Sequence, residues 1–162
     1  RDLHYPLRRQ RQMCIRDRAQ LYLVRALLPD MLMRGSGTVI NLTSEAGMID
    51  PPIKHSDGGW SFAHEATKAA LHRMAGILHL EYNEQGIRAY NVEPGLVASE
   101  SMIAVMGEVS ALEKMGIRPA LVTVPAAVIR WLCEQDTAGT MSGQNIHAQP
   151  FCKQYQLLEN WP

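Results

Sequence analysis

The feature that most constrains the fold is a regular alternation of helical segments with short runs that fit β-strands. The runs Thr38–Leu42, Ile87–Val92 and Gly143–Ala148 are typical of short strands. Helical segments are predicted before and between them, at 19–33, 60–83 and 125–135. Strands that alternate with helices indicate a parallel sheet. The sequence therefore predicts an α/β fold with parallel strands at 39–42, 88–92 and 145–147 and helices on both faces.

The boundaries of these helices follow from glycine and proline. Pro29 lies inside the segment 19–33, where it should kink the helix or end it early. Gly86 follows the segment 60–83 and fits a C-terminal stop, and Pro125 fits the start of the third helix. The remaining segments lack a clear period. They are predicted to be a loop at 45–59, a mobile lid at 96–120 and a tail at 149–162.

Residues 1–18 are interpreted as a leader that is not native to the protein. Residues 13–18 spell MCIRDR, which is how a common transposase sequencing adapter translates in one frame. The alternative is a basic disordered arm that contacts an acidic partner. The expected organisation is therefore a leader at 1–18, a partial domain at 19–148 and a C-terminal tail at 149–162.

Composition excludes several classes of partner. Sixteen basic residues balance sixteen acidic ones, so no net field attracts nucleic acid or a membrane surface. No apolar run approaches the ~18 residues that span a bilayer, and the leader lacks the apolar stretch of a signal peptide. The three cysteines have no metal-binding spacing, and their odd number favours a reducing compartment. A cytoplasmic location is expected.

Three segments carry residues with chemistry of their own. Ser44 follows the first strand in Asn-Leu-Thr-Ser, and Asn91–Gly95 (Asn-Val-Glu-Pro-Gly) ends the second. Lys68 lies four residues after His64, which places both on one face of the intervening helix. Taken singly, such a serine is usually a turn or cap residue and such a lysine is usually solvated. Their order and their strand–loop–helix–strand setting favour a shared site.

In that order and spacing, the segments resemble the second half of a short-chain dehydrogenase/reductase. The resemblance implies the C-terminal half of a Rossmann-like, doubly wound parallel sheet. It also implies an enzyme that interconverts a small carbonyl compound and its alcohol by hydride transfer with NAD or NADP. In the family, a Ser polarises the substrate oxygen, a Tyr is the acid or base, and a Lys lowers the Tyr pKa and holds the nicotinamide ribose. Ser44 and Lys68 match the Ser and the Lys, and His64 stands at the Tyr position.

The same resemblance implies which residues meet the cofactor. Lys68 would hold the nicotinamide ribose. Asn91, Pro94 and Gly95 match the segment that follows the next strand, and Ser99 matches a Ser or Thr on the nicotinamide side. Family members commonly dimerise through helices that match 19–33 and 60–83, so a homo-oligomer is expected.

Two departures from the family pattern predict that the chain is inactive as given. A histidine titrates near ~6.5 and a tyrosine near ~10, and the imidazole is also shorter. The Gly-rich turn that receives the pyrophosphate is missing from the sequence. The alternative is a non-catalytic relative, a pseudoenzyme that acts through oligomerisation. His64, His72 and His79 share one helical stripe, but a metal site needs ligands from another element, so no metal is expected.

Overall fold

The computed structural model describes residues 4–57, 59–106, 109–114, 118–137, 139–159 and 161, with side chains described from residue 18 onward except 105, 106, 111 and 112. The chain divides into two compact units, Arg1–Asn91 with Met141–Gln144 and Val92–Thr140 with Asn145–Pro162. Strands β1 (Gly37–Leu42), β2 (Ile87–Glu93) and β3 (Asn145–His147) form a parallel sheet in the order β1-β2-β3. The predicted α/β class and the three parallel strands are confirmed.

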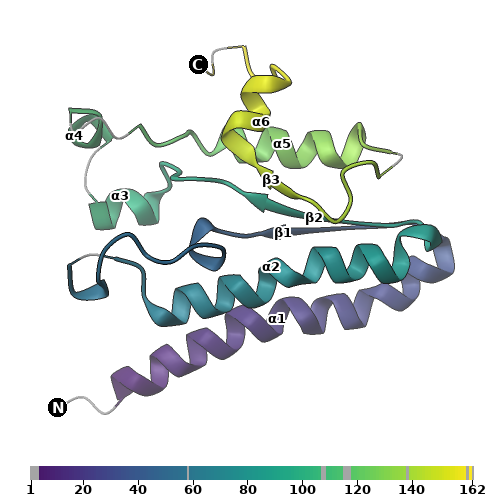
Figure 1. Ribbon diagram of the computed structural model, residues 1–162, viewed down its shortest axis with the longest axis horizontal. Coiled ribbons are helices and arrows are strands. Elements are labelled where there is room, and N and C mark those ends of the chain that lie inside the picture. The colour runs from purple at the N-terminus through teal and green to yellow at the C-terminus, as the bar shows by residue number, and fades with distance from the viewer. Residues whose placement is uncertain are drawn as a thin grey trace. The chain divides into compact units, whose positions relative to one another are not determined.

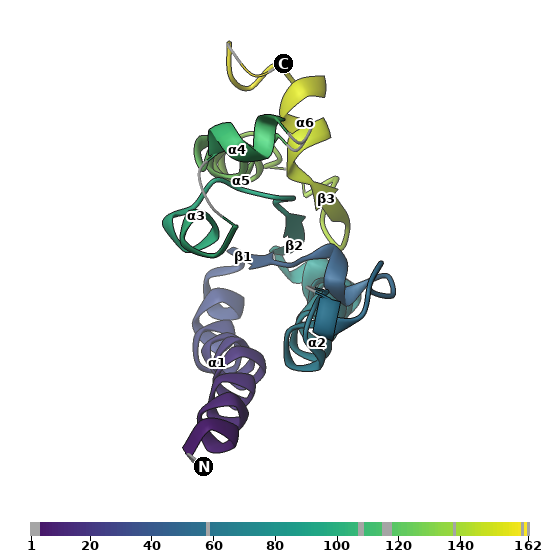
Figure 2. The same cartoon turned by 90° about the vertical axis from the view of Figure 1, so that its left-hand side faces the viewer.

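In the first unit, helices α1 (His4–Arg34) and α2 (Phe62–Tyr82) lie side by side on the same side of β1 (Figures 1 and 2). Small buried residues, Ala75 on α2 and Ala89 on β2, allow helix and strand to approach closely. Leu78 completes the buried cluster. The apolar residues packed around it are Val24, Leu28, Val39, Met74 and Tyr82.

Helix α1 is longer than the sequence predicts. It begins at His4, within the stretch interpreted as a leader, and it continues through Pro29 to Arg34. Pro29 therefore does not end the helix early, and a kink at this residue stays a prediction. Proline removes one N–H of the helical ladder, and Pro29 is exposed, so water can satisfy the carbonyl that loses its partner. The helix is followed by Gly35, which has a left-handed φ of 63°.

Between β1 and α2 the predicted loop contains two short 3-10 turns, η1 (Glu45–Gly47) and η2 (His55–Asp57). Ser61 caps α2, because its Oγ accepts a hydrogen bond from His64 N at 3.4 Å. After α2, the turn η3 (Asn83–Gln85) ends at Gly86, whose φ is 82°. The predicted stop at Gly86 is confirmed.

In the second unit, residues 96–120 contain α3 (Glu100–Met106), α4 (Val109–Lys114) and a parallel bridge between Val97 and Ala120. Helix α5 (Thr123–Glu134) buries Val124, Val128 and Leu132 along one stripe and packs against α6 (Ala148–Gln154). Pro125 lies near the start of α5, as predicted.

Helix α6 lies largely in the segment expected to be a tail without a clear period, and the sequence did not predict this helix. Seven residues are too few for a period to emerge from the sequence. Its Phe151 and the following Tyr155 form an aromatic cluster with Trp131 of α5, with ring centroids 4.4–5.2 Å apart. Burial raises the pKa of the Cys152 thiol beside them. None of the described helices combines the length and apolar character needed to cross a bilayer.

Candidate functional site

Two of the predicted catalytic residues, His64 and Lys68, line one cavity in the first unit. The cavity measures about 540 Å³ and lies against the end of β1 and the first half of α2. Its wall combines polar and apolar side chains. The other residues that line it are Gln20, Ile40, Asn41, Leu42, Thr67 and Leu71.

Helix α2 places the two side chains one turn apart on the same face. The cap at Ser61 starts the helix so that His64 lies in its first turn. The Lys68 ammonium donates a hydrogen bond to Leu42 O at 2.6 Å, which ties the helix to the last residue of β1. Buried Thr67 turns its hydroxyl back onto the helix, 2.8 Å from Ala63 O. The site therefore places a proton-carrying imidazole and a fixed ammonium beside the same cavity.

Ser44 lies on the turn that precedes η1 and is not among the residues that line the cavity. Its Oγ accepts a hydrogen bond from Ala46 N at 3.3 Å, so the hydroxyl caps the 3-10 turn. The turn itself packs closely on α2: a Cβ at Gly47 would lie 2.6 Å from the carbonyl carbon of Lys68. The structure thus brings the turn that carries Ser44 against the helix segment that carries Lys68.

Asn91 forms a buried cross-link within the first unit. Its Nδ2 donates to His72 O at 2.6 Å, and its Oδ1 accepts from Asn41 Nδ2 at 3.1 Å. Asn41 in turn lines the cavity, so Asn91 holds the strand end and the helix in register. The sequence signal for Asn41 was present in Asn-Leu-Thr-Ser, but its structural partner lies 50 residues away. Gln20, which also lines the cavity, carries no sequence signal.

The other predicted cofactor residues lie in the second unit, where β2 ends. Gly95 has a φ of 70°, and its N–H donates to Glu93 Oε1 at 2.8 Å. Pro94 O accepts a hydrogen bond from Gln149 Nε2 at 3.2 Å. Ser99 caps α3, because its Oγ accepts from Met102 N at 3.2 Å. Pro94, Gly95 and Ser99 thus lie in one short segment, and each of them takes part in a hydrogen bond.

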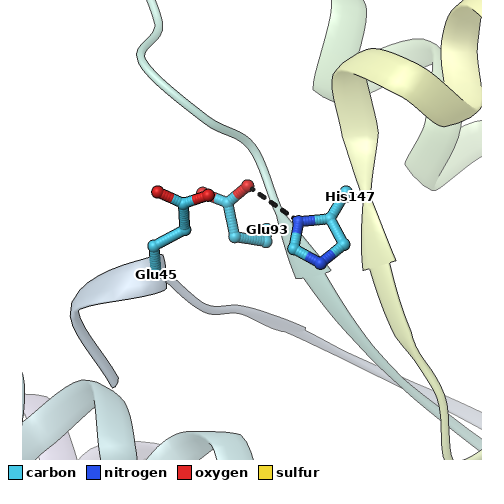
Figure 3. Close-up of side chains that lie close together, drawn as sticks. All are labelled: Glu45, Glu93 and His147. Carbon is cyan, nitrogen blue, oxygen red and sulfur yellow. Dashed lines mark ion pairs between the residues drawn. The ribbon is translucent and has the colours of Figure 1, made fainter. Parts of the chain in front are cut away.

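Sequence reasoning missed a close contact between a histidine and a carboxylate in the second unit. His147 Nδ1 lies 3.5 Å from Glu93 Oε2, and the Glu93 side chain is only 9% exposed (Figure 3). Glu93 comes from β2 and His147 from the parallel neighbour β3. Only the register of two strands more than fifty positions apart in sequence joins these residues, so no local pattern could have predicted the pair.

The sequence model of the short chain dehydrogenase family matches residues 10–108. A 2-keto-3-deoxy-L-fuconate dehydrogenase of Xanthomonas campestris pv. campestris is 31% identical over 93 residues, which are 57% of this chain and 29% of that protein. A very-long-chain 3-oxoacyl-CoA reductase of Mus musculus is 34% identical over 76 residues, 47% of this chain and 22% of that protein. The matched part therefore spans less than a third of either relative.

Solved structures of dehydrogenases and reductases have a similar fold. A 3-oxoacyl-[acyl-carrier protein] reductase with bound NAD from Brucella melitensis is 25% identical, with a TM-score of 0.69 over 88% of this chain and 50% of that one. A 4-hydroxyisoleucine dehydrogenase complexed with NADH shares the fold, at 19% identity and a TM-score of 0.63 over 83% of this chain and 55% of that one. Since the family match covers more than half of the sequence, the chain belongs to the short chain dehydrogenase family.

Proposed function

We propose that the chain is the catalytic portion of a nicotinamide-dependent oxidoreductase that interconverts a small carbonyl compound and its alcohol. The observation that carries the proposal is the pairing of His64 and Lys68, one helical turn apart, along one cavity at the end of β1. The names of the relatives, dehydrogenases and reductases, support the reaction class.

Each residue has a proposed role that its chemistry permits. The His64 imidazole exchanges a proton with the substrate oxygen, as a general acid in reduction and a general base in oxidation. The Lys68 ammonium, held by Leu42 O, keeps a positive charge at the cavity and favours the developing alkoxide. A hydroxyl both donates and accepts, so Ser44 can donate to the substrate oxygen while it caps η1.

The residues present fit one end of a nicotinamide cofactor, NAD or NADP. When bound, that group supplies or accepts the hydride. The donor set of the cavity, an ammonium with the Asn41 amide nearby, suits the hydroxyls of a ribose. In the second unit, Pro94, Gly95 and Ser99 are the proposed contacts of the nicotinamide. The sequence contains no Gly-x-Gly-x-x-Gly turn for a pyrophosphate, so we propose that the chain as given binds the whole cofactor weakly and is inactive.

A second candidate is a pseudoenzyme that acts by forming homo-oligomers through α1 and α2. Large apolar side chains on these helices support it, since Leu23, Phe62 and Leu80 are 60%, 77% and 86% exposed. Turnover distinguishes the two candidates, because only the first predicts it.

A cytoplasmic location is proposed for either candidate. It fits Cys133 and Cys152, which are free thiols.

The test is to join this chain to a compatible first half from a family relative and to measure steady-state ketone reduction and alcohol oxidation across pH. We expect slow turnover with His64. His64→Tyr should accelerate it toward the ~10²–10⁴-fold that general acid–base catalysis contributes. Lys68→Ala should abolish the gain.

Cofactor affinity, measured by fluorescence of the reduced nicotinamide, is the control. It should be similar in the histidine and tyrosine forms, because the change concerns proton transfer. Equal turnover of the two forms would show that His64 is a competent acid or that it is not the aligned residue. No turnover in any form would favour the pseudoenzyme.

A further inference from the structure

Gln149, on the first turn of α6, makes a two-pronged contact with the turn that follows β2. Its Nε2 donates to Pro94 O and to Leu96 O, each at 3.2 Å. A primary amide nitrogen carries two hydrogens, so this single group serves both carbonyls. Because the carbonyls flank Gly95, the two bonds together fix the conformation of that residue.

Gly95 fits this contact in two ways. Its φ of 70° lies in the left-handed region that glycine adopts without strain. A Cβ at this position would also collide with Gln149 Nε2. On the other side, Gly95 N donates to Glu93 Oε1 at 2.8 Å. The turn is therefore held between a carboxylate on β2 and an amide on α6.

The contact of Gln149 with Pro94 O and Leu96 O, which we call the clamp, is supported by further hydrogen bonds beyond the turn. Leu96 O also accepts from Ala120 N at 2.8 Å, and Ala98 N donates to Ala120 O at the same distance. Trp161 Nε1 donates to the main-chain oxygen of Gln149 at 3.3 Å. Two segments that are distant in sequence, at Ala120 and at Gln149, thus converge on the stretch from Pro94 to Ser99 within the second unit.

We propose that Gln149 is a positioning residue that preorganises the segment from Pro94 to Ser99 for the nicotinamide end of the cofactor. The ligand rests on the proposed function, whereas the clamp is a property of the second unit alone. A segment that is already ordered loses less conformational freedom when it binds. Gln149 would therefore raise affinity without touching the cofactor.

The first test is amide hydrogen exchange of the full chain, followed by mass spectrometry of peptides that cover residues 94–99. Gln149→Met keeps the length of the side chain and removes both donors. Loss of two ordinary hydrogen bonds should speed exchange in this segment roughly ten- to thirtyfold. Peptides from α5 serve as the internal reference and should be unchanged.

Gln149→Glu separates hydrogen bonding from packing. At neutral pH the introduced carboxylate has no hydrogen, so exchange should be at least as fast as in Gln149→Met. The two facing carbonyls, Pro94 O and Leu96 O, disfavour the charged form of the introduced group. Its protonated form offers one donor, so the exchange rate relative to the unmodified chain should fall as pH decreases from about 7 to about 5. Gln149→Met should show no such recovery.

The second test uses nicotinamide riboside, which has the nicotinamide and ribose and no pyrophosphate. Binding to the unmodified chain, followed by ligand NMR, should weaken about tenfold in Gln149→Met. Lys68→Ala should also weaken it while exchange at 94–99 stays unchanged. Unaltered exchange in Gln149→Met, or equal loss of protection in α5, overturns the clamp. If exchange changes as expected but nicotinamide riboside does not bind, the proposed function is overturned. The clamp would then remain, but its proposed role in binding the nicotinamide would not.

Discussion

At the scale of single residues, Gly47 decides how closely η1 can pack on α2. A Cβ there would lie 2.6–2.8 Å from main-chain atoms of Lys68 and Ala69, which cannot move independently of the helix. Gly47→Ala should therefore destabilise the first unit by ~1–3 kcal/mol, as overpacking usually does. Urea unfolding followed by circular dichroism measures the change.

Gly76→Ala, on the helix α2 against which η1 packs, is the control. A Cβ at Gly76 meets nothing within 4 Å, and alanine is the better helix former, so this variant should gain ~0.5–1 kcal/mol. If both substitutions stabilise the chain, η1 does not pack on α2 as closely as described.

Some contacts between single residues could be predicted from the sequence and others could not. The spacing of His64 and Lys68 predicted a shared helical face because four residues make one turn, and the cavity contains both. The Asn41–Asn91 bond and the Glu93–His147 pair depend on strand register. The residues of each pair lie about fifty positions apart in sequence, so no local pattern marks them.

At the scale of elements, α1 contains a proline that its exposed surface tolerates. Pro29 removes the hydrogen bond that residue 29 would donate to the carbonyl of Arg25. Pro29→Ala should restore it and stabilise the first unit by ~1–2 kcal/mol, because the greater freedom of the unfolded chain offsets part of the gain.

Ala26→Gly, on an exposed position of the same helix, is the opposite control and should lose ~1 kcal/mol. Thermal unfolding ranks the three forms. A lower midpoint for Pro29→Ala would mean that the proline fits a bend on which the packing of α1 depends.

Elements with a strong period or a clear terminator were the ones that the sequence predicted. The three strands lie within a residue or two of their expected bounds, and α2 leads through η3 to Gly86 as expected. The start of α1 and the whole of α6 were missed for opposite reasons. In the first case a polar helix lacks an apolar period, and in the second seven residues are too few to display one.

At the scale of the whole molecule, the sheet leaves β1 at one end of its order, with no further strand on its outer side among the described residues. An unpaired strand edge offers N–H and C=O groups to another chain. Next to it, a cavity of about 220 Å³ lies between α1 and β1 and is lined mainly by apolar side chains. Leu23 and Leu27, which reach this cavity, are 60% and 50% exposed. This surface favours self-association.

We therefore predict that the chain is obligately oligomeric or aggregation-prone, as measured by light scattering after size exclusion. Placing charges on the apolar surface, with Leu23→Lys and Leu27→Lys together, should shift the chain toward monomer because a buried contact would have to desolvate them. Leu121→Lys is the matched control, since Leu121 is equally exposed in the second unit and should leave the distribution unchanged. A monodisperse monomer that unfolds cooperatively by calorimetry would contradict the prediction, because it would show that the edge of β1 and the adjoining face of α1 are stable in water without a partner.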